Sequence, residues 1–258
     1  MIEPYYKDEL VTLYHGDCLE VLPQLSEKSV DMVLADLPYG ITELGWDSII
    51  DLSKLWFAYE RVSVGWAAIV LFGRQPFTSQ LVMSKSSWYR DEWIWEKDRA
   101  VGHLDAERRP MRAHENVLIF GKQRPRFFPQ KTEGHPPTNR QGGSVGNLPS
   151  MLRDGLVPST KYGQTDRFPR TVQRFDVPNG DLRGLHPTLK PIDLCKFFIK
   201  TYSLDNETIL DNTCGAGTTL VAAKQLGRKA IGIEIEEKYC ETAARRLQQE
   251  MSIAANSV

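Results

Sequence analysis

Short apolar runs that end in glycine or in an acidic turn alternate with helical patterns along this sequence. The first such runs are rich in Val, Ile, Leu and aromatic residues, as buried strands are; they cover residues 11–16, 31–40 and 66–73. Helical periodicity marks 48–62 and 76–85, and two more strand-like runs follow at 88–97 and 114–122. This alternation predicts an α/β fold with a doubly wound, mostly parallel sheet.

The alternation of strand-like and helical patterns stops in the middle of the chain and then resumes. Residues 122–183 are rich in Pro, Gly, Asn and Arg and have little periodicity, which predicts an irregular insertion. After it, the expected elements are helix 191–203, strand 207–214, helix 218–228, strand 229–236 and helix 237–251. We therefore divide the chain into 1–121, the insertion 122–183, a second half of the sheet domain at 184–251, and a tail at 252–258.

Charge is distributed unevenly along the chain. Residues 97–183 hold 16 Lys and Arg against 9 Asp and Glu, whereas the remainder holds 16 against 24, within a formal net charge of −1. A basic block in a near-neutral protein is typical of a surface that binds phosphates. A solvated basic face explains the same charges, so charge alone leaves both interpretations open.

The cysteines, histidines and apolar runs restrict the class of protein. Four cysteines occur without a C-x-x-C pair and five histidines without H-x-x-x-H spacing, so we expect no zinc site and no disulfide framework. No run of 18 apolar residues is present, and the N-terminal residues lack an apolar core. We therefore expect no signal peptide and no membrane span, and a cytoplasmic protein with reduced thiols.

A glycine turn follows the predicted strand 207–214. In LDNTCGAGTT, Gly215 and Gly217 would allow the backbone N–H groups at the start of the next helix to approach a ligand closely. Glu234 ends the next predicted strand, 23 residues after Asp211, where a carboxylate can accept hydrogen bonds from ribose hydroxyls. An ordinary strand-to-helix turn explains these residues equally well when they are taken alone.

A second polar turn, ADLPYG, ends the predicted strand 31–40. Pro38 stiffens a turn that carries Asp36 and Tyr39. An exocyclic amine of a nucleobase is a poor nucleophile because its lone pair is delocalised into the ring. A site that uses this amine must accept its hydrogen bonds and hold the ring flat, which an aspartate and a tyrosine can do. Taken alone, the same residues fit a turn with a solvated Asp and a packed Tyr.

Together, these motifs resemble those of the β-group of DNA amino-methyltransferases, which modify adenine N6 or cytosine N4. The DLPY sequence resembles the group's D-P-P-Y motif, and LDNTCGAGTT resembles its cofactor loop. GIEIEEKY and HPTLKP, at 232–239 and 186–191, resemble its ribose-binding strand end and its H-P-T-x-K-P stretch. The order, with the catalytic motif before the cofactor loop, is also that of the group. Two departures are Leu37 in place of the first proline and Asn-Thr-Cys at 212–214 in place of Pro-x-Phe.

The resemblance implies a Rossmann-like methyltransferase fold, S-adenosylmethionine as cofactor and double-stranded DNA as partner, with no metal. It implies that the 122–183 insertion recognises the target and that the chain can pair into a homodimer. The catalytic residues that it implies are Asp36, Leu37, Pro38 and Tyr39. The cofactor-binding residues that it implies are Asp17, His186, Thr188, Lys190, Asp211, Asn212, Cys214, Gly215, Gly217, Thr218 and Glu234. Among these, Asp17 would face the cofactor's adenine, and Thr188 with Lys190 would meet its carboxylate. His114 and Glu115 would lie on a strand that frames the base pocket.

The first residue of the DLPY motif indicates which base is methylated. Enzymes of this group that modify cytosine N4 usually carry S-P-P-Y, so Asp36 favours adenine N6, with cytosine N4 as the alternative. RNA and protein methyltransferases share a related N-P-P-Y turn but generally place the cofactor motif first. An NAD-linked oxidoreductase would carry a full G-x-G-x-x-G near its first strand. A DNA-binding protein with a decayed site would show broken motifs.

Three tryptophans bear on pairing between subunits. Trp46, Trp56 and Trp66 could mark a subunit contact, because enzymes of this group often pair. We favour the simpler interpretation that they are core residues of the first long helix and its neighbours.

Overall fold

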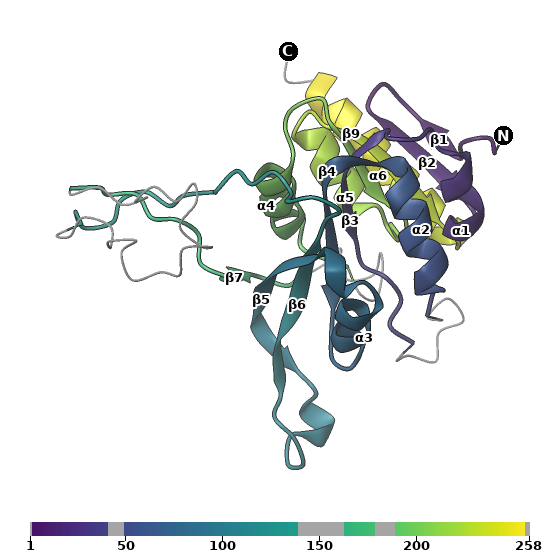
Figure 1. Ribbon diagram of the computed structural model, residues 1–258. Helices are drawn as coiled ribbons and strands as arrows, with labels where there is room; N and C mark the ends of the chain where they lie inside the picture. Colours follow the sequence, from purple (N-terminus) through teal and green to yellow (C-terminus); the bar gives the residue numbers. More distant parts are fainter. Residues whose placement is uncertain (1, 41–48, 139–162, 179–188, 256–258) are drawn as a thin grey trace. The chain divides into compact units, whose positions relative to one another are not determined.

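The computed structural model describes residues 2–40, 49–138, 163–178 and 189–255 (Figure 1). The chain divides into two compact units, of which the first comprises Met1–Phe128 with Thr171–Val258 and the second Pro129–Arg170. The predicted insertion 122–183 therefore contains the whole second unit and parts of the first.

The first unit is an α/β domain. Its strands are β1 (Tyr6–Lys7), β2 (Val11–His15), β3 (Val30–Ala35), β4 (Ser63–Gly73), β5 (Tyr89–Val101), β6 (Arg112–Phe120), β7 (Val172–Phe175), β8 (Thr208–Asp211) and β9 (Lys229–Glu234). Its α-helices are α1 (Cys18–Val21), α2 (Leu52–Val62), α3 (Phe77–Ser84), α4 (Ile192–Tyr202), α5 (Thr218–Gln225) and α6 (Glu237–Ala255). Its short 3-10 helices are η1 (Leu22–Gln24), η2 (Ser86–Trp88) and η3 (His103–Asp105).

The strands form one mixed sheet in the order β1-β2-β9-β8-β3-β4-β6-β5-β7. The pairings from β2 through β9, β8 and β3 to β4 are all parallel, and so is the β5–β7 pairing. β1 pairs antiparallel with β2, and β6 pairs antiparallel with both β4 and β5. The predicted α/β fold with a mostly parallel sheet is confirmed.

The connections reverse direction at the centre of this sheet. From β3 the chain crosses through α2 to β4 on one side, and from β8 it crosses through α5 to β9 on the other. Because β3 and β8 are neighbours, the loops after their carboxyl ends diverge and leave a crevice between them. Ligands of open α/β sheets bind in this position.

Alternate residues of the strands pack against the helices on the two faces of the sheet. Met32 and Leu34 point to the face covered by α4, α5 and α6, whereas Val33 and Ala35 point to the face covered by α1, α2 and α3. All four side chains are buried, so β3, which ends just before the predicted catalytic motif, is held on both sides.

Local capping and turn chemistry explain where two predicted elements differ from the structure. The Asp51 carboxylate accepts hydrogen bonds from the backbone N–H groups of Ser53 and Lys54, at 3.0 and 3.2 Å, and α2 begins after it. The predicted helical start at residue 48 is therefore wrong for 49–51, while residue 48 lies outside the described residues. Strand β3 stops at Ala35, before Pro38, rather than continuing to residue 40.

Other elements were not predicted or differ in length. The edge strands β1 and β7 were missed. β5 is longer than predicted and β6 begins two residues earlier and ends two residues earlier than predicted, because the two strands continue into a hairpin that ends in η3. Helix α6 continues to Ala255, into the predicted tail. None of the helices within the described ranges combines the length and apolar character needed to span a bilayer.

The tryptophans only partly follow the predicted core placement. Trp56 is buried in the core, where its indole Nε1 donates to the Ser84 hydroxyl at 2.9 Å. Trp66 is 46% exposed and lies under the Arg126 guanidinium, so its predicted place in the core is wrong. It belongs to the strand end before the fully buried part of β4. Trp46 lies outside the described residues.

The second unit is described over residues 129–138 and 163–170, which form a small antiparallel ladder. Thr132 pairs with Arg167, and the backbone N–H groups of His135 and Thr138 donate to Thr165 and Gln164. Lys131 forms an ion pair with Asp166 at 2.7 Å. In the described residues of this unit, backbone hydrogen bonds and this ion pair join the two segments.

Candidate functional site

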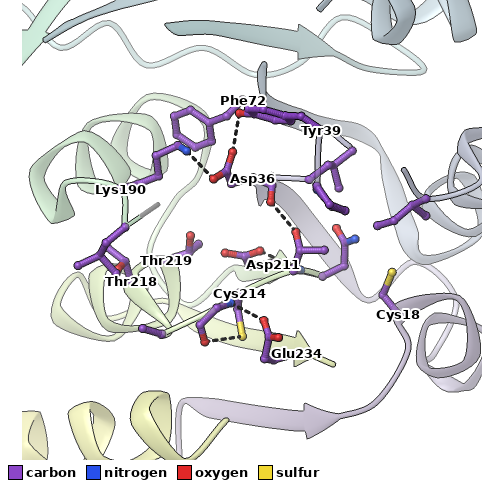
Figure 2. Close-up of a pocket in the computed structure, with 18 of the residues that line it drawn as sticks. Cys18, Asp36, Tyr39, Phe72, Lys190, Asp211, Cys214, Thr218, Thr219 and Glu234 are labelled. Atoms are coloured by element: carbon purple, nitrogen blue, oxygen red, sulfur yellow. Dashed lines mark hydrogen bonds and ion pairs between the residues drawn. The ribbon is translucent and has the colours of Figure 1, made fainter. Parts of the chain in front are cut away.

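A pocket of about 620 Å³ opens at the carboxyl edge of the parallel strands (Figure 2). Its walls come from the segments after β2, β3, β4, β8 and β9, which include the crevice between β3 and β8. The structure brings twelve of the predicted site residues into its lining: Asp17, Asp36, Leu37, Pro38, Tyr39, Lys190, Asp211, Asn212, Cys214, Gly215, Thr218 and Glu234. Gly217 lies in the same turn but not in the lining, and the predicted His186 and Thr188 lie outside the described residues.

Asp36 stands directly after β3 and is held from three sides. Its carboxylate accepts a hydrogen bond from the Tyr39 hydroxyl at 2.6 Å and a second from the Lys190 ammonium. The Thr213 hydroxyl donates to the Asp36 backbone carbonyl at 3.0 Å and so joins the DLPY turn to the glycine turn. Leu37, where the group's motif has proline, is buried among the α2-side core residues, and this packing fixes the turn.

The Asp36 carboxylate belongs to a chain of alternating charges. Lys190 also pairs with Glu115 of β6 at 3.3 Å, and Glu115 pairs with Lys97 of β5 at 2.5 Å. The Lys190 ammonium also lies 5.1 Å from the ring centre of Phe72, which presents an aromatic face to it. Two lysines and two carboxylates thus neutralise one another along one wall of the pocket.

The pKa values follow from burial and from these pairs. Burial raises the pKa of Asp36; Lys190 opposes this shift and Glu115 adds to it. Burial alone would lower the pKa of Lys190, but Asp36 and Glu115 raise it above its usual value. Burial alone would raise the pKa of Glu115, yet Lys190 and Lys97 hold it below its usual value. Lys190 therefore stays charged, and its ammonium opposes the protonation of Asp36 that burial favours.

The glycine turn and the end of β9 form the opposite wall. Glu234 accepts hydrogen bonds from the backbone N–H groups of Gly215 and Glu236, at 2.7 and 2.9 Å. Gly215 and Gly217 both adopt positive φ, and Gly217 precedes the first residue of α5. These bonds hold the Glu234 carboxylate against the glycine turn that precedes α5, as Figure 2 shows.

Comparison with known families matches these features to one family. The sequence profile of the DNA methylase family that comprises N6- and N4-specific enzymes matches residues 30–245, which run from the start of β3 to the middle of α6. This chain belongs to the N6/N4 DNA methylase family. The predicted resemblance is confirmed.

Relatives of this methylase align over almost its full length. The type II methyltransferase M1.MboII of Moraxella bovis is 25% identical over 256 residues, covering 93% of this chain and 98% of the relative. M.HinfI of Haemophilus influenzae is 28% identical over 277 residues, covering 96% of this chain and 71% of the relative.

Solved structures share the methylase fold. M1.HpyAVI in complex with SAM superimposes with a TM-score of 0.64 at 24% identity, covering 92% of this chain and 99% of the other. The cytosine-N4-specific PvuII DNA methyltransferase superimposes with a TM-score of 0.67 at 16% identity, covering 95% and 89%. The predicted Rossmann-like methyltransferase fold is confirmed.

Sequence reasoning missed several residues of the methylase pocket. Thr213 and Lys97 were not singled out, and Glu115 was noted only on a strand framing the pocket. No sequence signal identifies the first two, since a Thr in a turn and a Lys in a strand are common. The β5–β6 register, in which Trp95 stands opposite Glu115, brings Lys97 and Glu115 together.

Gly217 is predicted to tolerate no side chain. A Cβ there would lie 2.8 Å from the Ala243 Cβ, and φ is +75°. We expect Gly217→Ala to lower the free energy of unfolding by about 2–4 kcal/mol, from backbone strain and overpacking together. Urea denaturation measures this loss. Gly227→Ala is the matched control, because Gly227 has φ +69° with nothing within 4 Å and should show the strain alone. Equal losses in the two variants would contradict the packing argument.

Asp211 of the methylase is predicted to make stability depend on pH. Burial raises its pKa to about 7, so the folded protein binds a proton that the unfolded chain, with an ordinary carboxyl, releases at lower pH. The contribution of Asp211 to the free energy of unfolding is therefore complete at pH values below the ordinary carboxyl pKa. It is lost as the pH rises toward 7, by up to about 1.4 kcal/mol per pH unit. Asp211→Asn should then stabilise the fold more at pH 8 than at pH 5 in urea denaturation. A gain that is equal at both pH values would refute the assignment.

Proposed function

We propose that this chain transfers the methyl group of S-adenosylmethionine to N6 of adenine in double-stranded DNA. The observation that carries the proposal is the pairing of the Asp36 carboxylate with Tyr39 in the pocket, across from the glycine turn and Glu234. The pocket thus has one wall suited to an amino group and another suited to a ribose and its attached chain.

The chemistry of the pocket residues fits the cofactor. S-adenosylmethionine carries a positively charged sulfonium, which supplies the methyl group, and a ribose diol that needs hydrogen-bond acceptors. Asp36, Asp211 and Glu234 bring three carboxyl groups into the pocket lining, and the volume of about 620 Å³ is in the range of small-molecule sites. Glu234 would accept hydrogen bonds from the ribose hydroxyls, and Asp17, which caps α1, would lie at the adenine end.

The Asp36 turn would bind the target base. The Tyr39 ring packs against Phe77 with their centres 5.1 Å apart, which fixes the plane of a face on which a base can stack. Asp36 and the backbone carbonyl of Leu37 would accept the two N6 hydrogens. Pairing occupies these hydrogens in duplex DNA, so the base must leave the helix to reach the pocket.

Catalysis by these residues would consist of positioning and charge stabilisation. As Asp36 accepts the N6 hydrogens, the lone pair localises on nitrogen and can form the new N–C bond while the methyl–sulfur bond breaks. The nitrogen then carries a positive charge, which the Asp36 carboxylate stabilises until a proton leaves through it to water. Lys190 would hold Asp36 in place and contact the cofactor carboxylate, and no covalent enzyme intermediate forms.

Methylation of cytosine N4 is the second candidate. The family includes enzymes for both bases, and the PvuII enzyme that shares this fold acts on cytosine N4. Both exocyclic amines demand the same hydrogen-bond acceptors, so the geometry of the Asp36 turn serves either. The aspartate in place of the serine usual in cytosine enzymes favours adenine.

Contact with DNA would come from the basic middle of the chain. Residues 97–183 carry 16 Lys and Arg against 9 Asp and Glu, which suits binding to phosphates. We propose that the insertion 122–183 recognises the target sequence, since base contacts there would add the specificity that phosphate contacts lack.

Single-molecule methylation sequencing tests this function. Purified protein and S-adenosylmethionine are incubated with unmethylated genomic DNA, which is then sequenced with a kinetic readout of modified bases. We expect modified adenines confined to one short sequence motif. Modified cytosines would support the second candidate, and unmodified DNA would overturn the proposal.

A further inference from the structure

The β5–β6 hairpin ends in a fully exposed leucine. Strands β5 and β6 continue beyond the rest of the sheet (Figure 1), and η3 closes them at His103–Asp105. Leu104, at the centre of η3, is 107% exposed, so its side chain makes almost no contact with the fold. The packing of the domain therefore does not explain an apolar residue at this apex.

The apex follows a strand whose residues line the pocket. Trp95, Lys97 and Val101 of β5 line the same pocket as Asp36. Leu104 follows Val101 by three residues, so their Cα atoms are at most about 11 Å apart, or about three base-pair steps of DNA. A duplex that passes the Val101 end of the pocket lining, with one nucleotide in the pocket, would then lie beside this leucine.

The flanks of the hairpin are basic. Residues 97–112 contain five Lys and Arg against three Asp and Glu. Two of the arginines are paired locally, Arg99 with Asp98 at 3.0 Å and Arg109 with Asp105 at 2.6 Å. Arg108 is exposed beside the apex. An apolar tip between basic flanks suits a surface whose edges are phosphates and whose interior is stacked bases.

We propose that Leu104 is a wedge that enters the DNA base stack and fills the space vacated by the nucleotide in the pocket. This proposal rests on the proposed function, since it requires a flipped base. Rotating a base out of the duplex costs stacking and pairing, and an apolar side chain in the vacated space recovers part of that cost. Leu104 would thus stabilise the flipped state without touching the reacting atoms.

Two duplexes distinguish the wedge from a structural role. Both carry the methylation site found by sequencing, and in the second an abasic site faces the target base, so that flipping costs little. We expect Leu104→Ala to slow single-turnover transfer by about 10-fold or more on the first duplex and by less than about 2-fold on the second. Leu104→Met, which keeps an apolar side chain, should retain the rate. Met83→Ala is the control, because Met83 is 77% exposed on α3 and lies outside the pocket lining.

The outcomes separate the two proposals. An unchanged rate in Leu104→Ala, or an equal loss on both duplexes, would overturn the wedge while leaving the proposed function intact. Transfer to cytosine would overturn the adenine assignment, and the same comparison would then test the wedge at that base. If Leu104 instead contacts a second copy of the chain, Leu104→Asp would lower the mass found by light scattering without a DNA-dependent loss, which would also overturn the wedge.

Discussion

Replacing Asp36 with alanine should lower the rate of methyl transfer by about 1000-fold or more while changing cofactor affinity only a few-fold. The carboxylate is the acceptor for the target amine in this account, and it also anchors Tyr39 by a 2.6 Å hydrogen bond. Its removal therefore leaves the amine without its acceptor and the Tyr39 hydroxyl without this hydrogen bond. Lys190 keeps its ion pair with Glu115, so the pocket should still fold.

Two further variants sharpen this prediction. Asp36→Asn retains one acceptor oxygen but turns an amide N–H₂ toward the Tyr39 hydroxyl or the Lys190 ammonium, so we expect a smaller yet clear loss of rate. Glu241→Ala removes a carboxylate that is 65% exposed on α6, and the rate should be unchanged. Single-turnover transfer measures the rate, and calorimetry measures cofactor binding. Full activity in Asp36→Ala would remove Asp36 from the mechanism.

Replacing Glu234 with glutamine should raise the Kd for S-adenosylmethionine by about 10- to 100-fold. A hydrogen bond to a charged group contributes about 1.5–3 kcal/mol, and the carboxylate would accept from the ribose hydroxyls. Glutamine keeps one acceptor oxygen for the Gly215 N–H and loses the charge and the second acceptor. The loss should therefore fall on binding more than on folding.

Glu236→Gln is the matched control for Glu234. Glu236 lies two residues further along the chain and outside the pocket lining, and its carboxylate pairs with the exposed Lys238. Calorimetric titration of both variants, together with their thermal midpoints, separates binding from stability. Equal affinities in the two variants would show that the Glu234 carboxylate does not bind the cofactor.

The sequence predicted the elements whose signals are local. Apolar runs bounded by glycine or acids located β3, β4, β8 and β9, because a strand buried on both faces has little polar sequence. The start of α2 was misplaced because Ile49 and Ile50 continue the apolar pattern, whereas the Asp51 cap ends it. The edge strands β1 and β7 contain two and four residues, too few for any periodicity to be visible.

The sequence predicted the residues of the two turns that line the pocket, but not the contacts between separate elements. DLPY and the glycine loop carry their chemistry in adjacent residues, and the parallel sheet brings them to one edge. The contact between Thr213 and the Asp36 carbonyl joins residues 177 positions apart. Lys97 and Glu115 meet only through the β5–β6 register, which the sequence pattern does not specify. Contacts of this kind depend on tertiary structure.

Mass spectrometry of nucleosides tests the central claim most directly. DNA without methylated bases is incubated with the purified protein and S-adenosylmethionine that carries a trideuterated methyl group, then digested to nucleosides. We expect trideuterated N6-methyldeoxyadenosine, at a level that Asp36→Ala reduces to background. Trideuterated N4-methyldeoxycytidine in its place would contradict the adenine assignment, and the absence of any labelled nucleoside would contradict DNA methylation by this chain.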